Sequence, residues 1–583
     1  MKLDLRKGSR SRVLAAILIL AVGVFIMRLF YLQVIRHDYY VAKANEEQLK
    51  QWVIPANRGL IYVMNGSTPK LAVMNEAVYT VWADPTEVKD KDKSSIVSSL
   101  REIAGGNTRD GFEDLLAKKD TRYQVIATKL SRTQADKLKD KKFSGIGFQQ
   151  QTQRVYPEGA LAGQVLGFVN DAGIGNYGVE GALNNRLKGV DGKLQAVTDV
   201  RDVPLTLGDK NVNIPAKDGE SIVLSIDRNV QNYAEDALKR GVEKAGAKYG
   251  SVLVMDPQTG KVLAMASTPS YAPADFSKVT DGAVFNNPII SDPYEPASVI
   301  KTYAMSAGLD QGVITPDSTY NNTDSITIDG KTVHNALLGL TGTRTMQDVL
   351  NNSLNTGTVT VAQRLGDGQN ITYKARKTLY NYYHDRFQLG EKTGIELANE
   401  SAGIVVSPDD VQGNAVRYSN MTFGQGLDVT MLQVATGFSA MINGGTYRKP
   451  SIIQGTLNAD GELQQNPPAQ GTAVISKKTS DDMRSMTYKA RQSVSYMRSA
   501  DKKGYTIGGK TGTAETLRDG SYIKTETVGT YLGYGGASTP RYVIMVRVSA
   551  PNKNLEGGLH ASPIFTDISN WMIGYMKIAP EAQ

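Results

Sequence analysis

The sequence predicts an α+β protein in which an antiparallel sheet flanked by helices follows a smaller domain and a single transmembrane helix. Three observations lead to this prediction. A charge-free apolar run lies directly behind a cluster of cations at the N-terminus. Short strand and helix patterns alternate over residues 60–215. From residue 216 onward, an early helix and hairpin are followed by a long helical middle and two late strands.

The first element is a transmembrane anchor over residues 13–35. The run from Val13 to Met27 carries no charge, and after Arg28 the apolar pattern continues to residue 35. A helix of this length would measure about 34 Å, and a bilayer core is about 30 Å thick. Arg28 is off-centre and can extend its charge towards the interface. The preceding cations predict a cytoplasmic tail over residues 1–12, and they are Lys2, Arg6, Lys7, Arg10 and Arg12.

A cleaved signal peptide is the alternative interpretation, because the uncharged run is short. The nearby small-x-small site is Ala42-Lys43-Ala44, which lies far beyond the apolar run. We therefore expect a retained anchor, with the residues after 36 outside the cytoplasm and the protein in the cell membrane as a single-pass protein. A buried core helix is disfavoured by the flanking cations.

The composition excludes several function classes. The chain has 583 residues, a formal net charge of +8, no cysteine and four histidines. Disulfides and thiolate nucleophiles are therefore excluded, and without an H-E-x-x-H motif a histidine metal site is not expected. Lysine and arginine are scattered rather than gathered on one face, so nucleic acid is not an expected partner. No metal and no cofactor are predicted.

The pattern changes near Ala216, which predicts a domain boundary. The expected divisions are the tail (1–12), the anchor (13–35), a pedestal domain (36–215) and the large α+β domain (216–583). Asn65-Gly66 predicts a tight turn between two strands in the pedestal. The large domain is expected to contain a helix over 229–245 and strands over 221–226, 250–256, 261–266, 531–534 and 542–549.

A Ser-x-x-Lys motif occurs four times, and only the copy at Ser298 and Lys301 has a suitable setting. Pro293 and Pro296 precede it and a run of small residues follows, which predicts that Ser298 lies in the first turn of a helix. Residues i and i+3 share a helix face, so Lys301 can reach Ser298 and take its proton. The developing negative charge would also be favoured by the helix N-terminus.

The other three copies have unsuitable surroundings. Ser67 is followed by a proline within its motif, which argues against a helix. Ser521 follows a turn sequence and is expected in a hairpin, and no helix of small residues follows Ser499.

Two further motifs complete a possible site. Ser353-Leu354-Asn355 is expected at the end of a helix that stops at Thr356-Gly357, in a loop that faces a cleft. Lys510-Thr511-Gly512-Thr513 follows two glycines in an edge-strand pattern, where an extended peptide can pair. A second Lys-Thr-Gly at Lys392 is expected in a connecting loop, with its lysine in solvent.

This triple of motifs is the signature of class A β-lactamases and penicillin-binding proteins. Its order and spacing here resemble the transpeptidase domain of class B penicillin-binding proteins, and the resemblance covers nearly the whole chain. It extends to segments outside the triple, namely 28–34, 54–59, 154–157, 178–181, 287–288, 294–296, 423–426 and 443–450. One departure stands directly before the nucleophile: the family usually has glycine where this chain has Ala297, which a positive φ would make costly.

The resemblance implies a peptidoglycan D,D-transpeptidase that is acylated and inhibited by β-lactams. Its implied catalytic residues are Ser298 as nucleophile, Lys301 as general base and Ser353 as proton relay. Asn355 would hold the substrate amide, and Lys510, Thr511, Gly512 and Thr513 would form the carboxylate-binding strand. The backbone N–H groups of Ser298 and Thr513 would form the oxyanion hole. Burial and the charge of Lys510 would lower the pKa of Lys301, although the identity of the base is disputed in this superfamily.

The sequence is less consistent with other functions. A class A β-lactamase needs a deacylating Glu-x-x-Leu-Asn after the Ser-x-Asn motif, and here Glu180 to Asn184 comes before the nucleophile. A sensor or non-catalytic scaffold is disfavoured by the short tail and the intact triple, and a glycosyltransferase by the lack of its paired glutamates. Septal synthesis is favoured over side-wall synthesis, with stem peptides, a polytopic glycan polymerase and divisome proteins as expected partners.

Overall fold

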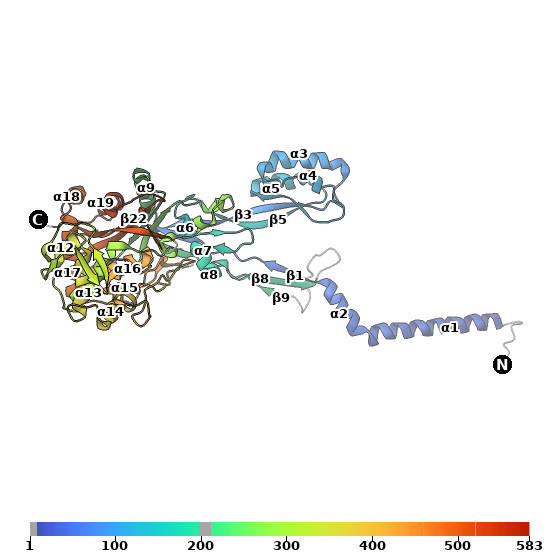
Figure 1. Ribbon diagram of the computed structural model, residues 1–583. Helices are drawn as coiled ribbons and strands as arrows, with labels where there is room; N and C mark the ends of the chain where they lie inside the picture. Colours follow the sequence, from blue (N-terminus) through green and yellow to red (C-terminus); the bar gives the residue numbers. More distant parts are fainter. Residues whose placement is uncertain (1–8, 198–211, 459, 519–520, 582–583) are drawn as a thin grey trace. The chain divides into compact units, whose positions relative to one another are not determined.

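The computed structural model describes residues 9–197, 212–458, 460–518 and 521–581 (Figure 1). The chain divides into two compact units, residues 1–58 with 188–219 and residues 59–187 with 220–583. The expected boundary between residues 215 and 216 does not coincide with this division and stays a prediction. Of the predicted cations, Lys2, Arg6 and Lys7 lie outside the described residues.

The first unit contains the predicted membrane helix. Helix α1 (Ser9–Phe30) continues into a π-helical turn at Tyr31–Ile35. Within the described residues, Arg10–Ile35 is the one helix long and apolar enough to cross a membrane, and its most apolar window is fully unburied. Helix α2 (His37–Gln48) follows. An antiparallel sheet then joins, in spatial order, β1 (Leu49–Ile54), β8 (Gly192–Val197) and β9 (Val212–Ile214).

The pedestal part of the second unit is built on a hairpin at the predicted turn. Strands β2 (Ile61–Asn65) and β3 (Thr68–Ala83) pair antiparallel, and Gly66 between them has φ +63°. This left-handed conformation explains the glycine of the Asn-Gly turn. Five further strands complete this sheet: β4 (Gln124–Leu130), β5 (Ile146–Val155), β10 (Ile222–Asp227), β18 (Ile453–Leu457) and β19 (Leu463–Gln465).

Short amphipathic helices cover the β3–β5 end of this sheet (Figure 1). They are α3 (Lys93–Ala104), α4 (Phe112–Leu115) and α5 (Arg132–Lys139). Three small helices follow: α6 (Gly163–Leu166), α7 (Gly178–Ala182) and α8 (Asn184–Lys188). On α7, Glu180 is fully buried and accepts a hydrogen bond from Arg154 Nε at 2.7 Å, so the carboxylate is committed to an internal ion pair.

The large domain is centred on a five-stranded antiparallel sheet in the order β12-β11-β23-β22-β21. Its strands are β11 (Tyr249–Met255), β12 (Val262–Thr268), β21 (Thr506–Arg518), β22 (Ser521–Gly536) and β23 (Pro540–Ser549). Successive residues face opposite sides of a strand. Accordingly, Val252 and Val254 belong to one hydrophobic core, and Leu253 and Met255 belong to the other.

Helices cover both faces of this sheet, as the α+β prediction requires. On one face lie α9 (Arg228–Ala245) and α19 (Ser562–Tyr575). The other core contains α11 (Lys301–Asp310), α13 (Asn355–Leu365), α16 (Met431–Ile442) and α17 (Lys477–Gln492). Figure 1 shows these two groups on opposite sides of β22. The predicted early helix, hairpin and late strands are all confirmed.

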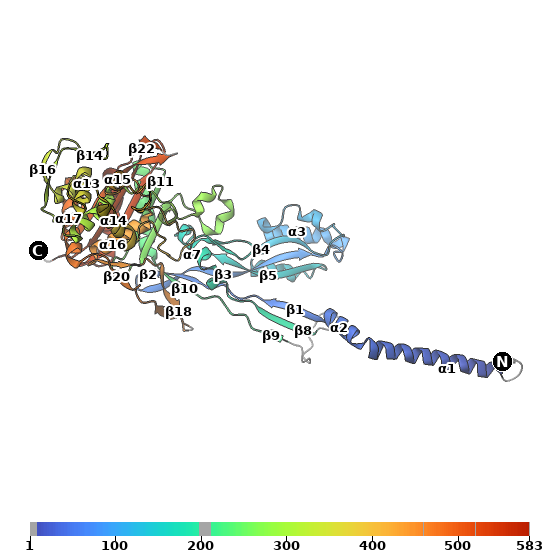
Figure 2. The same cartoon turned by 60° about the horizontal axis from the view of Figure 1, so that its bottom comes forward.

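Smaller elements fill the connections. The other helices are α10 (Pro288–Ser291), α12 (Met346–Asn351), α14 (Tyr373–Tyr380), α15 (Ala415–Met421) and α18 (Ser495–Ala500). Four short strands form two hairpin-like pairs near α13, and they are β13 (Thr319–Asn322), β14 (Ser325–Ile328), β15 (Lys331–His334) and β16 (Gly342–Thr345) (Figure 2). The two remaining pairs join β6 (Phe168–Val169) to β7 (Gly175–Asn176), and β17 (Thr446–Arg448) to β20 (Gly471–Ala473).

Candidate active site

Ser298 lies where the sequence predicts it, in the first turn of a helix. A 3₁₀ turn over Ala297–Ile300 leads directly into α11, whose first residue is Lys301. Pro296 precedes the turn as its N-cap. The side chain of Ser298 is partly exposed, whereas Lys301 is completely buried. Solvent therefore reaches Ser298, whereas Lys301 is shielded from it.

Ala297 has φ +56°, in the left-handed region that favours glycine. Its N–H donates to the carbonyl of Gly424 at 3.2 Å. A Cβ on Gly424 would lie 2.0 Å from the Ala297 carbonyl oxygen, so the two backbones are in direct contact. From the sequence, Ala297 is expected to be costly if its φ is positive. The structure has this positive φ. A left-handed alanine costs about 1–2 kcal/mol, and such strain is characteristic of functional sites.

Three motifs meet at the hydroxyl of Ser353. Lys301 Nζ donates to Ser353 Oγ at 3.0 Å and also to its carbonyl oxygen. Lys510 Nζ donates to the same Oγ at 3.0 Å. The sequence predicted that these side chains form one site, and the structure brings them together. The predicted direct contact of Lys301 with Ser298 stays a prediction, because the amine here is bonded to Ser353.

The two lysines have strongly altered proton affinities. Burial lowers the pKa of Lys301 well below its ordinary value, and the neighbouring charge of Lys510 lowers it further. Burial lowers the pKa of Lys510 to about 7. A neutral amine at Lys301 is what a general base near neutral pH requires.

The strand β21 forms one wall of the site and one edge of the five-stranded sheet. It passes the nucleophile turn at Gly512, where a Cβ would lie 2.9 Å from the Pro296 carbonyl oxygen and 3.4 Å from the Ala297 side chain. This close approach explains the glycine of the Lys-Thr-Gly motif. The oxyanion hole expected from the backbone N–H groups of Ser298 and Thr513 stays a prediction.

The prediction for the Ser353 segment was partly wrong. Ser353 does lie between helices, with φ +56°, but the chain does not leave helical structure at Thr356-Gly357. Instead α13 begins at Asn355. Gly357 is needed for packing, since a Cβ there would lie 2.1 Å from the side chain of Val349. Asn355 Nδ2 donates to the carbonyl of His334 at 2.7 Å, which fixes the direction of its side-chain amide.

The alternative motif copies lie in different surroundings. Lys392 is exposed in a loop, whereas Lys510 is 3% exposed. Ser67 lies in the β2–β3 turn, Ser499 lies on α18, and Ser521 begins β22. None of these serines lies in a turn that leads into a buried lysine.

Comparison with known proteins decides the family. The family described as penicillin binding protein transpeptidase domain matches residues 250–570, and the penicillin-binding protein dimerisation domain matches residues 53–224. The chain is a penicillin-binding protein. A relative from Mycolicibacterium smegmatis, penicillin-binding protein PbpB, is 31% identical over 96% of this chain and 88% of its own length. The peptidoglycan D,D-transpeptidase FtsI of Escherichia coli is 28% identical over 98% of this chain and 93% of its own.

Solved structures agree with this assignment. Penicillin binding protein 3 from Mycobacterium tuberculosis, in complex with aztreonam, is 27% identical to this penicillin-binding protein and superposes with a TM-score of 0.68. The match covers 91% of this chain and 98% of that one. The transpeptidase fold with an N-terminal dimerisation domain is thereby confirmed.

One group near the site of this penicillin-binding protein was missed by sequence reasoning. Glu295 is buried just before the nucleophile turn, accepts the N–H of Gly426 at 2.7 Å, and accepts the phenol of Tyr522 at 3.0 Å. Burial raises the pKa of Glu295. The side chain of Glu295 thereby links the turn by hydrogen bonds to the 423–426 segment and to the β21–β22 hairpin. Segments 294–296 and 423–426 resemble the family, but the contact between them could not be predicted because they are far apart in the sequence.

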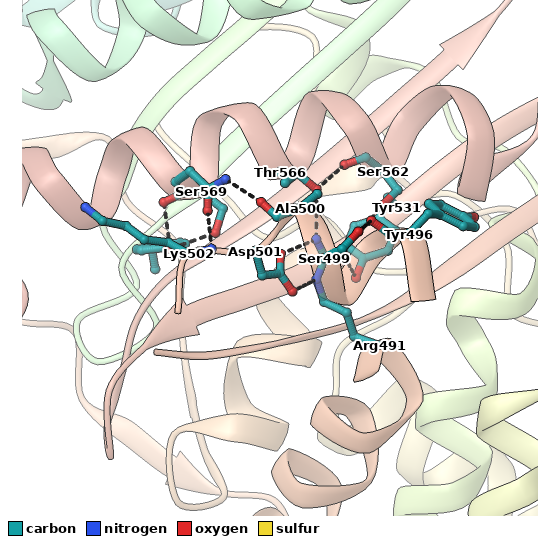
Figure 3. A network of polar contacts seen from close by, with 12 residues as sticks. Arg491, Tyr496, Ser499, Ala500, Asp501, Lys502, Tyr531, Ser562, Thr566 and Ser569 are labelled. Atoms are coloured by element: carbon teal, nitrogen blue, oxygen red, sulfur yellow. Dashed lines mark hydrogen bonds and ion pairs between the residues drawn. The ribbon is translucent and has the colours of Figure 1, made fainter. Parts of the chain in front are cut away.

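The second residue that sequence analysis did not identify is Arg491, which contacts the strand paired with β21. Arg491, at the end of α17, is 1% exposed and pairs with Asp501 through bonds of 2.8 and 2.6 Å. It also donates to Tyr531 at 2.6 Å and to Thr566 at 2.8 Å. Figure 3 shows the guanidinium between Asp501 and the hydroxyl groups of α19. Tyr531 lies directly opposite Thr511 in the β21–β22 ladder, so this cluster supports the strand that carries the site.

Proposed function

We propose that this penicillin-binding protein cross-links peptidoglycan as a serine D,D-transpeptidase with Ser298 as its nucleophile. The observation that carries the proposal is the position of the Ser353 hydroxyl, which bridges two buried lysine amines beside an edge strand. This arrangement can move a proton between a nucleophile and a leaving group while a peptide pairs with β21. The name of the Escherichia coli relative, peptidoglycan D,D-transpeptidase FtsI, describes the same chemistry.

The first half-reaction forms the acyl-enzyme. Lys301, as a neutral amine, accepts the proton of Ser298 Oγ as that oxygen attacks the carbonyl between the last two D-alanines of a stem peptide. The oxyanion of the tetrahedral intermediate is held by the backbone N–H groups of Ser298 and Thr513. The C–N bond then breaks, and the proton passes through Ser353 to the departing D-alanine nitrogen.

The second half-reaction forms the cross-link. An amine of a neighbouring stem peptide attacks the ester carbonyl, the C–O bond to Ser298 breaks, and the proton released by the amine returns to Ser298 through the lysine. Asn355 orients the substrate amide. Lys510, Thr511, Gly512 and Thr513 hold the terminal carboxylate, with Lys510 supplying positive charge.

The β-lactamase alternative lacks a deacylating group. The only Glu-x-x-Leu-Asn segment begins at Glu180, whose carboxylate is buried against Arg154. We therefore expect a long-lived penicilloyl-enzyme. Rapid multiple turnover of a β-lactam would contradict this assignment.

The anchor and the partners belong to the same proposal. Residues 13–35 of the apolar helix Arg10–Ile35 hold the protein in the cell membrane, with residues 2–12 in the cytoplasm and the transpeptidase domain outside. The division of the chain into tail, anchor, pedestal (36–215) and transpeptidase domain (216–583) is proposed with it. Septal wall synthesis beside a polytopic glycan polymerase and divisome proteins is the expected context. A mature N-terminus near residue 45 in membrane fractions would contradict the retained anchor.

The enzymatic test is release of D-alanine from a stem pentapeptide in the presence of a D-amino acid acceptor. The parent domain should release D-alanine and form the exchanged peptide. The Ser298→Ala variant should do neither, and Ser67→Ala should behave as the parent. Exchange that persists in Ser298→Ala would overturn the assignment of the nucleophile.

A further inference from the structure

A tyrosine on α18 lies next to the strand that carries the candidate carboxylate site. Tyr496 is 49% exposed. A Cβ placed on Gly558 would lie 2.7 Å from the Tyr496 hydroxyl and 3.9 Å from Thr511 Cγ2. The phenol and Thr511 are therefore both close neighbours of Gly558. The neighbouring Gly557 donates its N–H to Thr513 Oγ1 at 3.1 Å, so the 557–558 segment contacts Thr513 and passes close to Thr511 and Tyr496.

The buried Arg491 cluster fixes the position of α18. Asp501, directly after the helix, is held by Arg491 through two hydrogen bonds (Figure 3). Within α18, Ser499 Oγ donates to the backbone carbonyl of Tyr496 at 3.2 Å. Arg491 also bonds Tyr531, the ladder partner of Thr511. One rigid cluster thus positions both α18 and the strand, which is the preorganisation that a binding group needs.

The phenol has an unused hydrogen bond. Among the described residues the Tyr496 hydroxyl has no hydrogen-bond partner, in contrast to the phenols of Tyr505 and Tyr531. Burial, together with the nearby carboxylate of Glu556, raises the pKa of Tyr496, so the group remains an O–H donor at neutral pH. Thr511 and Thr513 present hydroxyl groups on the same edge. Several donors in one neighbourhood suit an anion with more than one oxygen.

We propose that Tyr496 determines specificity by donating a hydrogen bond to the terminal carboxylate of the donor peptide, opposite Thr511. The proposal rests on the proposed function and extends it. It implies selection for a last residue with a free carboxylate over one that is amidated or esterified. In a β-lactam, the carboxylate on the ring fused to the lactam takes the same place.

The test compares acylation of the soluble transpeptidase unit by a penicillin and by its methyl ester, with parent, Tyr496→Phe and Tyr505→Phe. Tyr505→Phe is the matched control, because its phenol donates to the Ile578 carbonyl and does not approach Thr511. Tyr496→Phe should slow acylation by the free acid about tenfold, the usual loss for a hydrogen bond to a charged group, and should slow the ester less than about threefold. Tyr505→Phe should leave both rates unchanged.

Each other outcome has a definite meaning. Equal slowing of acid and ester by Tyr496→Phe, or no slowing of either, would overturn the role of the phenol while leaving the proposed function intact. An unreactive parent protein would instead overturn the proposed function, and with it this inference. If Tyr505→Phe is also slow, the ratio of the acid rate to the ester rate in Tyr496→Phe decides. A Tyr496→Phe variant that keeps the parent's ratio has lost activity through general destabilisation, and this result would overturn the role of the phenol.

Discussion

Lys510 and Lys392 offer the sharpest comparison, because both begin a Lys-Thr-Gly sequence and only one lies in the site. Lys510 Nζ donates to Ser353 Oγ at 3.0 Å, to the Thr511 carbonyl at 3.1 Å and to Thr511 Oγ1 at 3.3 Å. Lys392 is exposed in a loop. Lys510→Ala removes the contact to Ser353, the charge that attracts a carboxylate, and the charge that adds to the effect of burial in lowering the pKa of Lys301.

The magnitude follows from the contacts that are lost. A hydrogen bond to a charged group is worth about 1.5–3 kcal/mol, and each factor of ten in rate corresponds to about 1.36 kcal/mol. Lys510→Ala should therefore slow penicillin acylation by roughly 10- to 150-fold. Surface substitutions are usually worth less than about 0.5 kcal/mol, so Lys392→Ala should change the rate by about twofold at most.

The assay follows penicilloyl-enzyme formation by stopped-flow or quenched mass spectrometry at several penicillin concentrations. Second-order rate constants are compared for the parent and both variants. A slow Lys392→Ala together with a normal Lys510→Ala would refute the placement of the third motif, and the site geometry would have to be redrawn.

Three further predictions follow from the same contacts. The acylation rate should rise with pH as Lys301 loses its proton, and because the charge of Lys510 helps to lower that pKa, the acid limb should move to higher pH in Lys510→Ala; a shift to lower pH would contradict this. Ala297→Gly should relieve a left-handed alanine and raise the melting temperature by about 1–3 °C in calorimetry, whereas a lower melting temperature would show that φ +56° carries no strain. Arg491→Ala should leave Asp501 buried without its cation and lower the free energy of unfolding by about 3–5 kcal/mol in urea titrations, and a loss below about 1 kcal/mol would contradict the burial of this pair.

The predictable part of the site is the part encoded locally. Ser298 was recognised because prolines before it and small residues after it specify a helix start, and Lys510 because the glycines that precede it specify an edge strand. In both cases the backbone conformation and the chemistry are written within a few neighbouring residues. The predicted helix over 229–245 and the late strands were recoverable for the same reason, since their hydrophobic periodicity is strong.

The rest depends on contacts between distant segments. Thr356-Gly357 is typical of a helix end, yet Gly357 lies inside α13. The residue is glycine because Val349 leaves no room for a side chain. Glu295 meets Tyr522, and Arg491 meets Thr566, only after the sheet and helices have assembled. A sequence shows that a glycine or a charged residue is present at a position. Only the fold shows which distant residue it contacts.

The central claim is that Ser298 is the nucleophile, and intact-mass spectrometry after incubation with penicillin tests it most directly. The parent domain should gain the mass of one penicillin, peptide mapping should place the adduct on Ser298, and Ser298→Ala should gain none. An adduct that persists on Ser298→Ala, or that maps to Ser67, Ser499 or Ser521, would contradict the account.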